Sequence, residues 1–254
     1  MTPARGRIVI LRAPDRAEAL RAALVEAGFE VVVRPVTCVE YIGPRVGDEW
    51  PGWTTAADWV VFTSLNGVNG FARGLGGDTA LAKLLTGRRV AVLGATSAQR
   101  LAAAGVRIDV VEEHGTATEL ATALLARMKP DSIVIYPCGE DALPTLPQAL
   151  RAAGLRVEQL VCYRTAPVPL PERAVLDWST FDAAIVAAPS AVRALRNEVS
   201  LPTDFGFFAI GPTTAAAVRE AGFKVLGIAD SPKAESIVAL VESCRVGEVR
   251  QRRM

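Results

Sequence analysis

Short apolar runs alternate with segments of helical periodicity along the whole chain. In the first such pair, residues 8–11 are apolar in succession, which is typical of a strand buried on both faces. Residues 14–27 then carry alanine and leucine at the spacing of one helix face, and Gly28 suits the end of that helix. The same alternation predicts ten strands, near residues 7–12, 31–33, 58–63, 88–93, 106–111, 132–136, 155–160, 181–186, 205–210 and 223–228. Helices between most of them predict an α/β fold with parallel sheets.

The chain repeats itself, which divides the predicted strands into two sets. Residues 58–64 correspond to 182–188 at an offset of 124, and residues 94–98 correspond to 211–215 at an offset of 117. The segment that begins at Ile8 has its counterpart near Ile133. Because the three blocks match in the same order, we expect two similar, flavodoxin-like domains with parallel sheets of five strands each.

Two divisions of the chain into domains fit this pattern. A single cut near residue 130 leaves five predicted strands on each side. In a swapped division, one α/β domain is discontinuous and the other lies between its two parts. The swapped division has residues 1–36 with 168–254 as the first domain, 44–159 as the second, and 37–43 and 160–167 as linker strands. The pattern of apolar residues alone does not decide between the two.

Composition and charge narrow the function classes. Half of the 254 residues are hydrophobic and 22% are charged, which excludes a disordered chain. The net charge is only +1, so we expect no bulk attraction to nucleic acid or to a membrane surface. No apolar run has the length of a bilayer span, and the first residues lack a signal-peptide core. We therefore expect a cytoplasmic protein, and a monomer by default.

The residue types that most often carry metal or nucleophilic chemistry are sparse. The four cysteines are scattered and form no CxxC pair, and His114 is the single histidine. A zinc site therefore has no ligand set, and His114 has no nucleophile motif near it. If the protein is an enzyme, we expect chemistry that needs neither a metal ion nor a histidine.

Four strand-to-helix turns carry small polar residues. They contribute these candidate substrate-binding residues: Ser64, Asn66, Gly94, Thr96, Ser97, Ser190, Gly211, Thr213 and Thr214. One interpretation is helix capping, in which hydroxyl oxygens accept the unpaired N–H groups of the first turn. The other is anion binding, because free N–H groups at the carboxyl ends of parallel strands attract carboxylates or phosphates. Both interpretations remain open at this stage, and no turn matches a P-loop or a dinucleotide fingerprint.

Two further residues are candidates for the chemistry. Tyr163 lies in a proposed linker strand, where it is either a half-buried strand tyrosine or a phenolic proton donor. Arg12 follows the first strand, where it is either an exposed charge at a helix entry or a partner for an anionic ligand.

Taken together and in their order along the chain, these motifs resemble those of the uroporphyrinogen-III synthase family. The matching segments are residues 58–64 with Asn66 and Val68, 94–98, 162–165 and 209–215, together with Arg12 and Pro35. The resemblance implies two α/β domains joined by a two-stranded linker, in the swapped division. It also implies cyclisation of hydroxymethylbilane to uroporphyrinogen III in tetrapyrrole biosynthesis, with loss of water, inversion of the last ring and no cofactor.

The resemblance implies roles for particular residues and also has gaps. Tyr163 matches the tyrosine that assists departure of the hydroxyl group, and the hydroxyl and glycine turns match residues that line the family's cleft. The match to Thr63-Ser64 in the second repeat is Ala187-Ala188, where the family commonly has a serine, and Leu11 replaces a threonine. These departures leave open an alternative, a non-catalytic sensor of tetrapyrroles or anions on the same fold.

Overall fold

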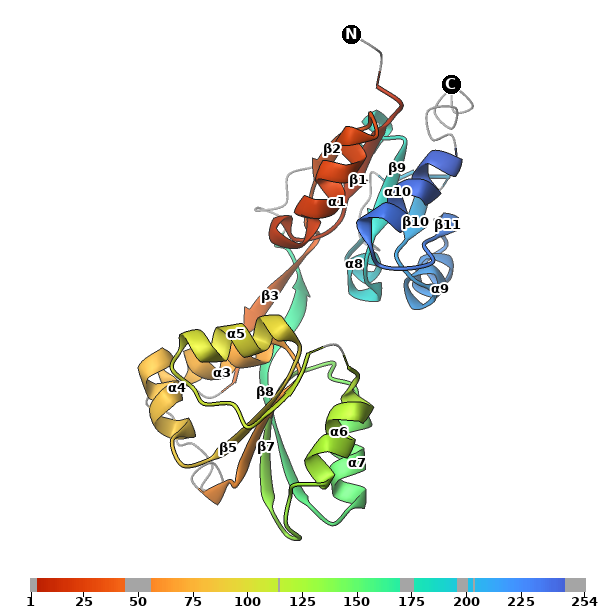
Figure 1. Ribbon diagram of the computed structural model, residues 1–254. Helices are drawn as coiled ribbons and strands as arrows, with labels where there is room; N and C mark the ends of the chain where they lie inside the picture. Colours follow the sequence, from red (N-terminus) through yellow and green to blue (C-terminus); the bar gives the residue numbers. More distant parts are fainter. Residues whose placement is uncertain are drawn as a thin grey trace. The chain divides into compact units, whose positions relative to one another are not determined.

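The structure is a computed structural model that describes residues 4–43, 56–113, 115–169, 176–195, 201–202 and 204–244. The chain divides into two compact domains. The first consists of Met1–Cys38 and Ala166–Met254, and the second of Val39–Thr165. The chain passes between them twice, along β3 (Thr37–Tyr41) and β8 (Arg156–Pro167) (Figure 1).

The first domain contains a sheet of five parallel strands in the order β11-β10-β9-β1-β2. The strands are β1 (Arg7–Ile10), β2 (Glu30–Val33), β9 (Ala183–Val186), β10 (Gly206–Ala209) and β11 (Lys224–Ile228). Its helices are α1 (Pro14–Glu26), η1 (Trp178–Thr180), α8 (Pro189–Leu195), α9 (Pro212–Glu220) and α10 (Ala234–Ser243).

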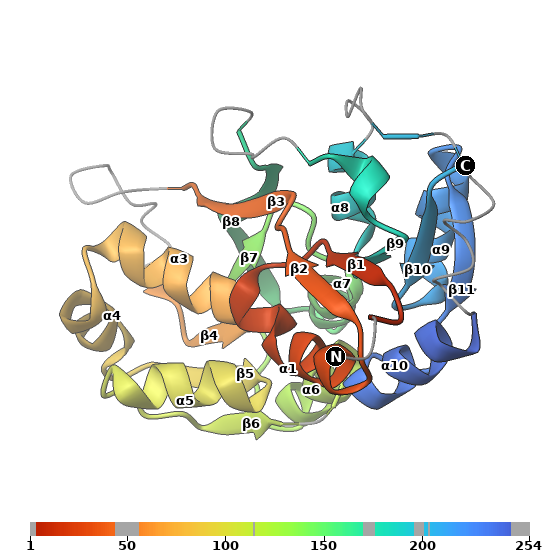
Figure 2. The same ribbon diagram turned by 90° about the horizontal axis from the view of Figure 1, so that it is seen from above.

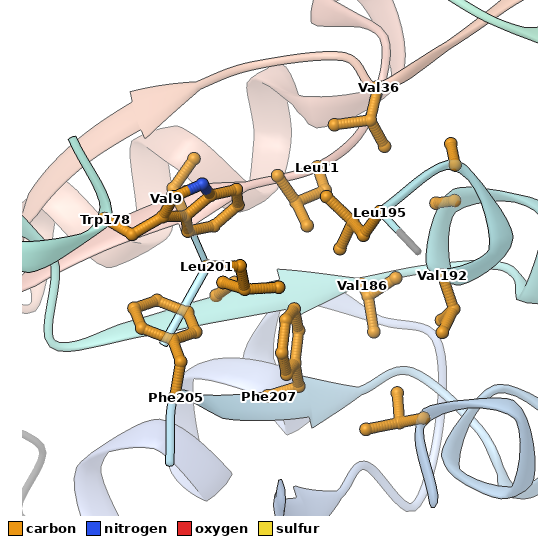
Figure 3. Packing of buried hydrophobic residues seen from close by; sticks show 14 of the residues in the cluster. Val9, Leu11, Val36, Trp178, Val186, Val192, Leu195, Leu201, Phe205 and Phe207 are labelled. Carbon is orange, nitrogen blue, oxygen red and sulfur yellow. The ribbon is translucent and has the colours of Figure 1, made fainter. Parts of the chain in front are cut away.

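Side chains that alternate along β1 build the two cores of this domain. Ile8 and Ile10 pack with residues of α1 and α10, two helices that lie on one face of the sheet (Figure 2). Val9 and Leu11 pack with α8 and α9 on the other, where Trp178, Phe205 and Phe207 fill the interior (Figure 3). This alternation follows from the two-residue period of a strand. Because both faces are covered, the strand reads as a continuous apolar run.

The second domain contains a sheet of six strands in the order β3-β8-β7-β4-β5-β6. Besides β3 and β8, the strands are β4 (Trp59–Phe62), β5 (Arg89–Leu93), β6 (Val110–Glu112) and β7 (Ile133–Gly139). One face packs against α3 (Leu65–Leu75), α4 (Asp78–Leu85) and α5 (Ala95–Ala103), and the other against α6 (Ala117–Leu125) and α7 (Thr145–Ala152). The α/β prediction is confirmed, because the ten predicted strands pair in parallel in two similar domains.

The linker strands β3 and β8 run antiparallel. The N–H of Ile42 bonds to the carbonyl of Cys162, and the N–H of Val168 bonds to the carbonyl of Val36, so residue numbers rise on one strand as they fall on the other. The expectation of five strands in each sheet is therefore too low for the second domain. The sixth strand is β3, which the sheet gains by pairing with β8.

The repeated aspartate before β4 and β9 fixes the start of a neighbouring strand. Asp58 accepts the N–H of Ile133 at 2.8 Å, and Asp182 accepts the N–H of Arg7 at 2.6 Å. The main-chain N–H of each aspartate returns a bond to the carbonyl of the same partner residue. The repeat found in the sequence is thus a repeated pairing of strand ends.

Two glycines one turn apart allow α3 to lie directly against β7 and β8. A Cβ at Gly67 would come within 2.8 Å of the carbonyl oxygen of Pro137, and one at Gly70 within 2.8 Å of Cys162. Real Cβ atoms do not approach other atoms so closely. The close approach brings the N-terminus of α3 to the carboxyl ends of these strands.

Among the described residues, no helix has the length and apolarity needed to span a membrane.

Candidate functional site

Tyr163 and Ser64 meet at the carboxyl edge of the sheet in the second domain. Tyr163 lies on β8, and Ser64 lies just after the end of β4. The Tyr163 Oη is 3.1 Å from the Ser64 Oγ. Ser64 is also the N-cap of α3, because its Oγ accepts the N–H of Gly67 at 3.0 Å. A hydroxyl group has one proton and two lone pairs. Ser64 can therefore accept from Gly67 and either donate to Tyr163 or accept from it.

Gly139 makes room for the Tyr163 phenol. The two residues are paired between β7 and β8, just after a register shift at Cys138. A Cβ at Gly139 would lie 2.7 Å from Cζ of Tyr163 and 3.0 Å from its Oη. Sequence reasoning missed Gly139, although a glycine at the end of an apolar strand signals a close approach of this kind.

A second tyrosine lies deeper in the same domain. Tyr136 is buried, and its Oη lies 2.9 Å from Oγ1 of Thr63. Burial raises the pKa of Tyr136, while the bond to Thr63 opposes the rise. The phenol of Tyr136 therefore stays protonated at neutral pH, and its single hydroxyl contact is structural.

The nearby cysteines are not candidate nucleophiles. Cys162 is 2% exposed, and burial raises its pKa to about 12. Burial also raises the pKa of Cys138. Both thiols stay protonated at neutral pH, and a thiol reacts through its thiolate. The part of the chain that the structure describes contains no group of three metal-ligating side chains, and His114 lies outside that part.

The N-terminus of α5 lies after β5, the strand beside β4. Gly94 is its N-cap, with φ of +91°, and no side chain caps the helix. Thr96 is exposed, and Ser97 is only 4% exposed. The capping interpretation therefore applies to Ser64 and not to this turn. The first N–H groups of α5 lack an acceptor within the helix, as at every helix start.

Arg12 occupies the corresponding edge of the first domain, after β1. It is half-buried, and it has no hydrogen bond or ion pair within the described ranges. Burial lowers the pKa of Arg12, Arg16 lowers it further and Asp15 raises it. A guanidinium group keeps its charge despite such a shift. Arg12 is thus a partly desolvated cation that can pair with an anionic ligand.

Two further turns lie at this edge, after β9 and β10. Gly211 is the N-cap of α9 without a side-chain cap, Thr213 is exposed and Thr214 is 4% exposed. Ser190 is half-buried in the first turn of α8. Thr213 and Thr214 repeat the exposure pattern of Thr96 and Ser97 in the second domain. The exposed hydroxyls are the ones a ligand can reach without rearrangement.

The structure groups the predicted site residues into two sets, one at the carboxyl edge of each sheet. The second domain holds Tyr163, Ser64, Asn66, Gly94, Thr96 and Ser97. The first domain holds Arg12, Ser190, Gly211, Thr213 and Thr214. Ligands bind at this edge in open α/β sheets.

Comparison with known proteins gives consistent results. A family model described as uroporphyrinogen-III synthase HemD matches residues 4–239. The structure of a uroporphyrinogen-III synthetase from Helicobacter pylori 26695 aligns with a TM-score of 0.64 and 20% identity, over 94% of this chain and 99% of that one. A mutant uroporphyrinogen III synthase from Thermus thermophilus aligns with a TM-score of 0.53 and 23% identity, over 94% and 98%. At these identities, the two structures show a shared fold.

Proposed function

This chain belongs to the uroporphyrinogen-III synthase family, and from that premise we propose that it is a cyclising lyase. Its substrate is the linear tetrapyrrole hydroxymethylbilane, and its product is uroporphyrinogen III. The reaction inverts the last pyrrole ring and releases one water molecule. We assign the reaction to the site where the Tyr163 and Ser64 hydroxyl groups meet, beside Gly139. That pair of hydroxyl groups is the observation that supports the assignment.

Tyr163 is the proposed proton donor for the leaving group. The pyrrole nitrogen of the first ring pushes electrons toward the hydroxymethyl carbon, and the C–O bond breaks. The Tyr163 O–H gives its proton to the departing hydroxyl, which leaves as water, and Ser64 holds the phenol oxygen. The last ring then attacks through its substituted carbon to form a spiro intermediate. The bond from the spiro carbon to its original methylene bridge then breaks, which leaves a cation on the third ring. The unsubstituted carbon of the last ring attacks that methylene carbon, and the proton lost from the attacking carbon returns to the phenolate of Tyr163.

The driving force from the pyrrole nitrogen explains why a weak acid suffices. A phenol is a poor general acid at neutral pH, so it can assist only a leaving group that is already being expelled. The larger task of the protein is to hold the chain so that the substituted carbon lies near the cationic centre. Positioning of this kind is a recognised source of catalysis.

Backbone N–H groups and one arginine are proposed to hold the substrate carboxylates. The exposed first turns of α5 and α9, marked by Thr96 and Thr213, offer N–H groups that lack helical acceptors. Arg12 adds a partly buried positive charge without a carboxylate partner among the described residues. This arrangement suits a ligand with many carboxylates in a protein whose net charge is only +1.

The sequence also led to expectations about oligomeric state, location, cofactors and partners, which we keep as proposals. We propose that the protein acts as a monomer in the cytoplasm, without a metal ion or cofactor and without a nucleic-acid partner. The near-neutral charge of the chain supports the last point.

The test is to incubate the purified protein with freshly prepared hydroxymethylbilane and to separate the product isomers after oxidation to porphyrins. We expect the type III isomer. Type I forms spontaneously, so a product mixture that contains only type I would reject the proposed activity. Tight binding of hydroxymethylbilane without type III product would instead support the sensor alternative.

A further inference from the structure

A pocket of about 770 Å³ opens at the amino edge of the sheet in the second domain. The charged and aromatic residues in its lining are Trp59, Arg88, Arg89, Arg107, Asp109 and Arg127. They come from the start of β4 and from the turns before β5 and β6 and after α6. Because β5 begins at Arg89 and ends just before Gly94, this pocket and the Tyr163 site lie at opposite ends of the same parallel strands.

The charges that line the pocket are strongly unbalanced. Among the described residues that line it, four are arginines (Arg88, Arg89, Arg107 and Arg127) and one is a carboxylate, Asp109. Of the four arginines, we rely only on Arg89, Arg107 and Arg127. Asp109 is already engaged, since its Oδ2 accepts the N–H of Val90 at 2.9 Å and its Oδ1 lies 3.3 Å from Arg107. The Arg107 side chain is 90% exposed, so this ion pair is weak. By contrast, the smaller pocket between α8 and α9 has one arginine and one glutamate.

Two of the arginines form no ion pair within the part of the chain that the structure describes, and their contacts are to neutral groups. The guanidinium of Arg89 lies over the ring of Trp59, at 5.5 Å from the centroid. Stacking on an aromatic face leaves the N–H groups at the edge of the guanidinium available. Arg127 donates one N–H to the carbonyl of Ala123 at 2.8 Å, and a neutral carbonyl does not cancel the charge. Guanidinium groups in this state suit phosphate and carboxylate oxygens, which they bind in pairs.

The backbone around the arginines leaves space for a ligand. Gly87 and Gly105 line the pocket with φ of +79° and +76°, and neither has an atom within 4 Å of the place where a Cβ would stand. The volume lies within the range of about 300–1,000 Å³ that is common for small-molecule sites.

We propose that this pocket is a binding site for a small polyanion with clustered phosphate or carboxylate oxygens. The site is separate from the proposed substrate site, and it requires at least two of the arginines to act together. Arg107 and Arg127 supply charge from different turns, while Arg89 is fixed on Trp59.

Calorimetric titration of the full chain tests the proposal, with sodium tripolyphosphate and sodium citrate as separate probes. The variant is Arg107→Gln with Arg127→Gln, both at exposed positions. The control is Arg219→Gln with Lys224→Gln, which removes the same charge from exposed positions in the first domain. Thermal unfolding should show that both double variants keep the stability of the natural chain.

We expect one-to-one binding of at least one probe at low ionic strength, weakened about tenfold or more by the pocket variant and less than about twofold by the control. Binding of tripolyphosphate alone assigns a phosphate ligand, and binding of citrate as well extends the site to carboxylates. The proposal is overturned if neither probe binds, or if both double variants weaken binding equally. It is also overturned if Arg12→Gln abolishes binding while the pocket variant does not. Each of these results is independent of whether the protein makes uroporphyrinogen III.

Discussion

Tyr163 differs from its buried neighbour Tyr136 in what its hydroxyl can reach. Tyr163 is half-buried at the sheet edge beside Ser64, whereas Tyr136 is 3% exposed and bonds to Thr63. We expect Tyr163→Phe to lower kcat about tenfold to a hundredfold, at or below the usual contribution of a general acid, because the substrate expels its own leaving group. Steady-state kinetics with hydroxymethylbilane measure this effect.

Tyr136→Phe is the matched control for this substitution. It removes one buried hydroxyl contact, so it should cost about 1 kcal/mol of stability and leave kcat unchanged. Equal turnover of Tyr163→Phe and the natural chain would remove Tyr163 from the mechanism.

Gly139 sets the position of the Tyr163 phenol. Gly139→Ala would place a Cβ 2.7 Å from Cζ of Tyr163, so the ring must move. We expect kcat to fall about as far as in Tyr163→Phe, with a stability loss of about 1–3 kcal/mol from overpacking. Gly206→Ala is the control, because its Cβ would come within 2.5 Å of Leu226 in the first domain. If the two variants have the same kcat, Gly139 has no role in positioning the phenol.

Burial of Cys162 predicts a loss of stability at alkaline pH. Its pKa rises from 9.0 to about 12 in the folded chain. Above pH 9 the unfolded chain therefore binds fewer protons than the folded one, and the free energy of unfolding falls as pH increases, at most by about 1.4 kcal/mol per pH unit for one thiol. Urea unfolding between pH 8 and 11 should show a smaller decline in Cys162→Ala. Parallel curves for the two proteins would contradict the assignment.

At the scale of elements, the two aspartates that precede β4 and β9 make the same bonds in different surroundings. Asp182 is 4% exposed, whereas Asp58 is exposed. An N–H left without its acceptor costs more where water cannot reach it. We expect Asp182→Ala to lower the free energy of unfolding by about 1–3 kcal/mol and Asp58→Ala by less than about 1 kcal/mol. Urea denaturation measures both, and an equal or larger loss in Asp58→Ala would contradict this account.

The apolar pattern predicted the ten parallel strands well where a strand is covered on both faces, as for residues 8–10. It failed at the strand expected over 106–111, which begins only at Val110. Val106 is buried, but its N–H bonds to the carbonyl of Leu101 at the end of α5. An apolar residue that anchors the end of a helix cannot be distinguished by pattern from the first residue of a strand.

The turns show a similar limit. A hydroxyl residue near the start of a helix is either an N-cap or an exposed hydrogen-bond donor. In the described parts of the four turns, the structure shows a side-chain cap at Ser64 only. At α5 and α9 a glycine takes the N-cap position, which shifts the hydroxyls into the helix. Whether a hydroxyl then faces solvent, as in Thr96, or the core, as in Ser97, depends on how the helix is rotated on the sheet. That rotation is set by packing and is not visible in a short motif.

At the scale of the molecule, the internal repeat was the most informative feature of the sequence. It predicted two similar α/β domains before any single motif pointed to a function, and both sheets carry the repeated blocks at equivalent strands. The glycine at the end of β7 signals a close approach, but neither its partner, Tyr163, nor the arginine pocket was predictable, because each contact joins segments that are apart in sequence. The proposed function uses the two sheet edges where helix N-termini gather, and the arginine pocket lies outside both.

The fraction of type III isomer among the products tests the central claim most directly. Spontaneous closure of hydroxymethylbilane gives type I, so type III requires the ring inversion that we assign to this protein. We expect the type III fraction to rise with protein concentration until it dominates, and Tyr163→Phe to need more protein to reach the same fraction. A product that remains type I at every protein concentration would show that the protein does not invert the ring.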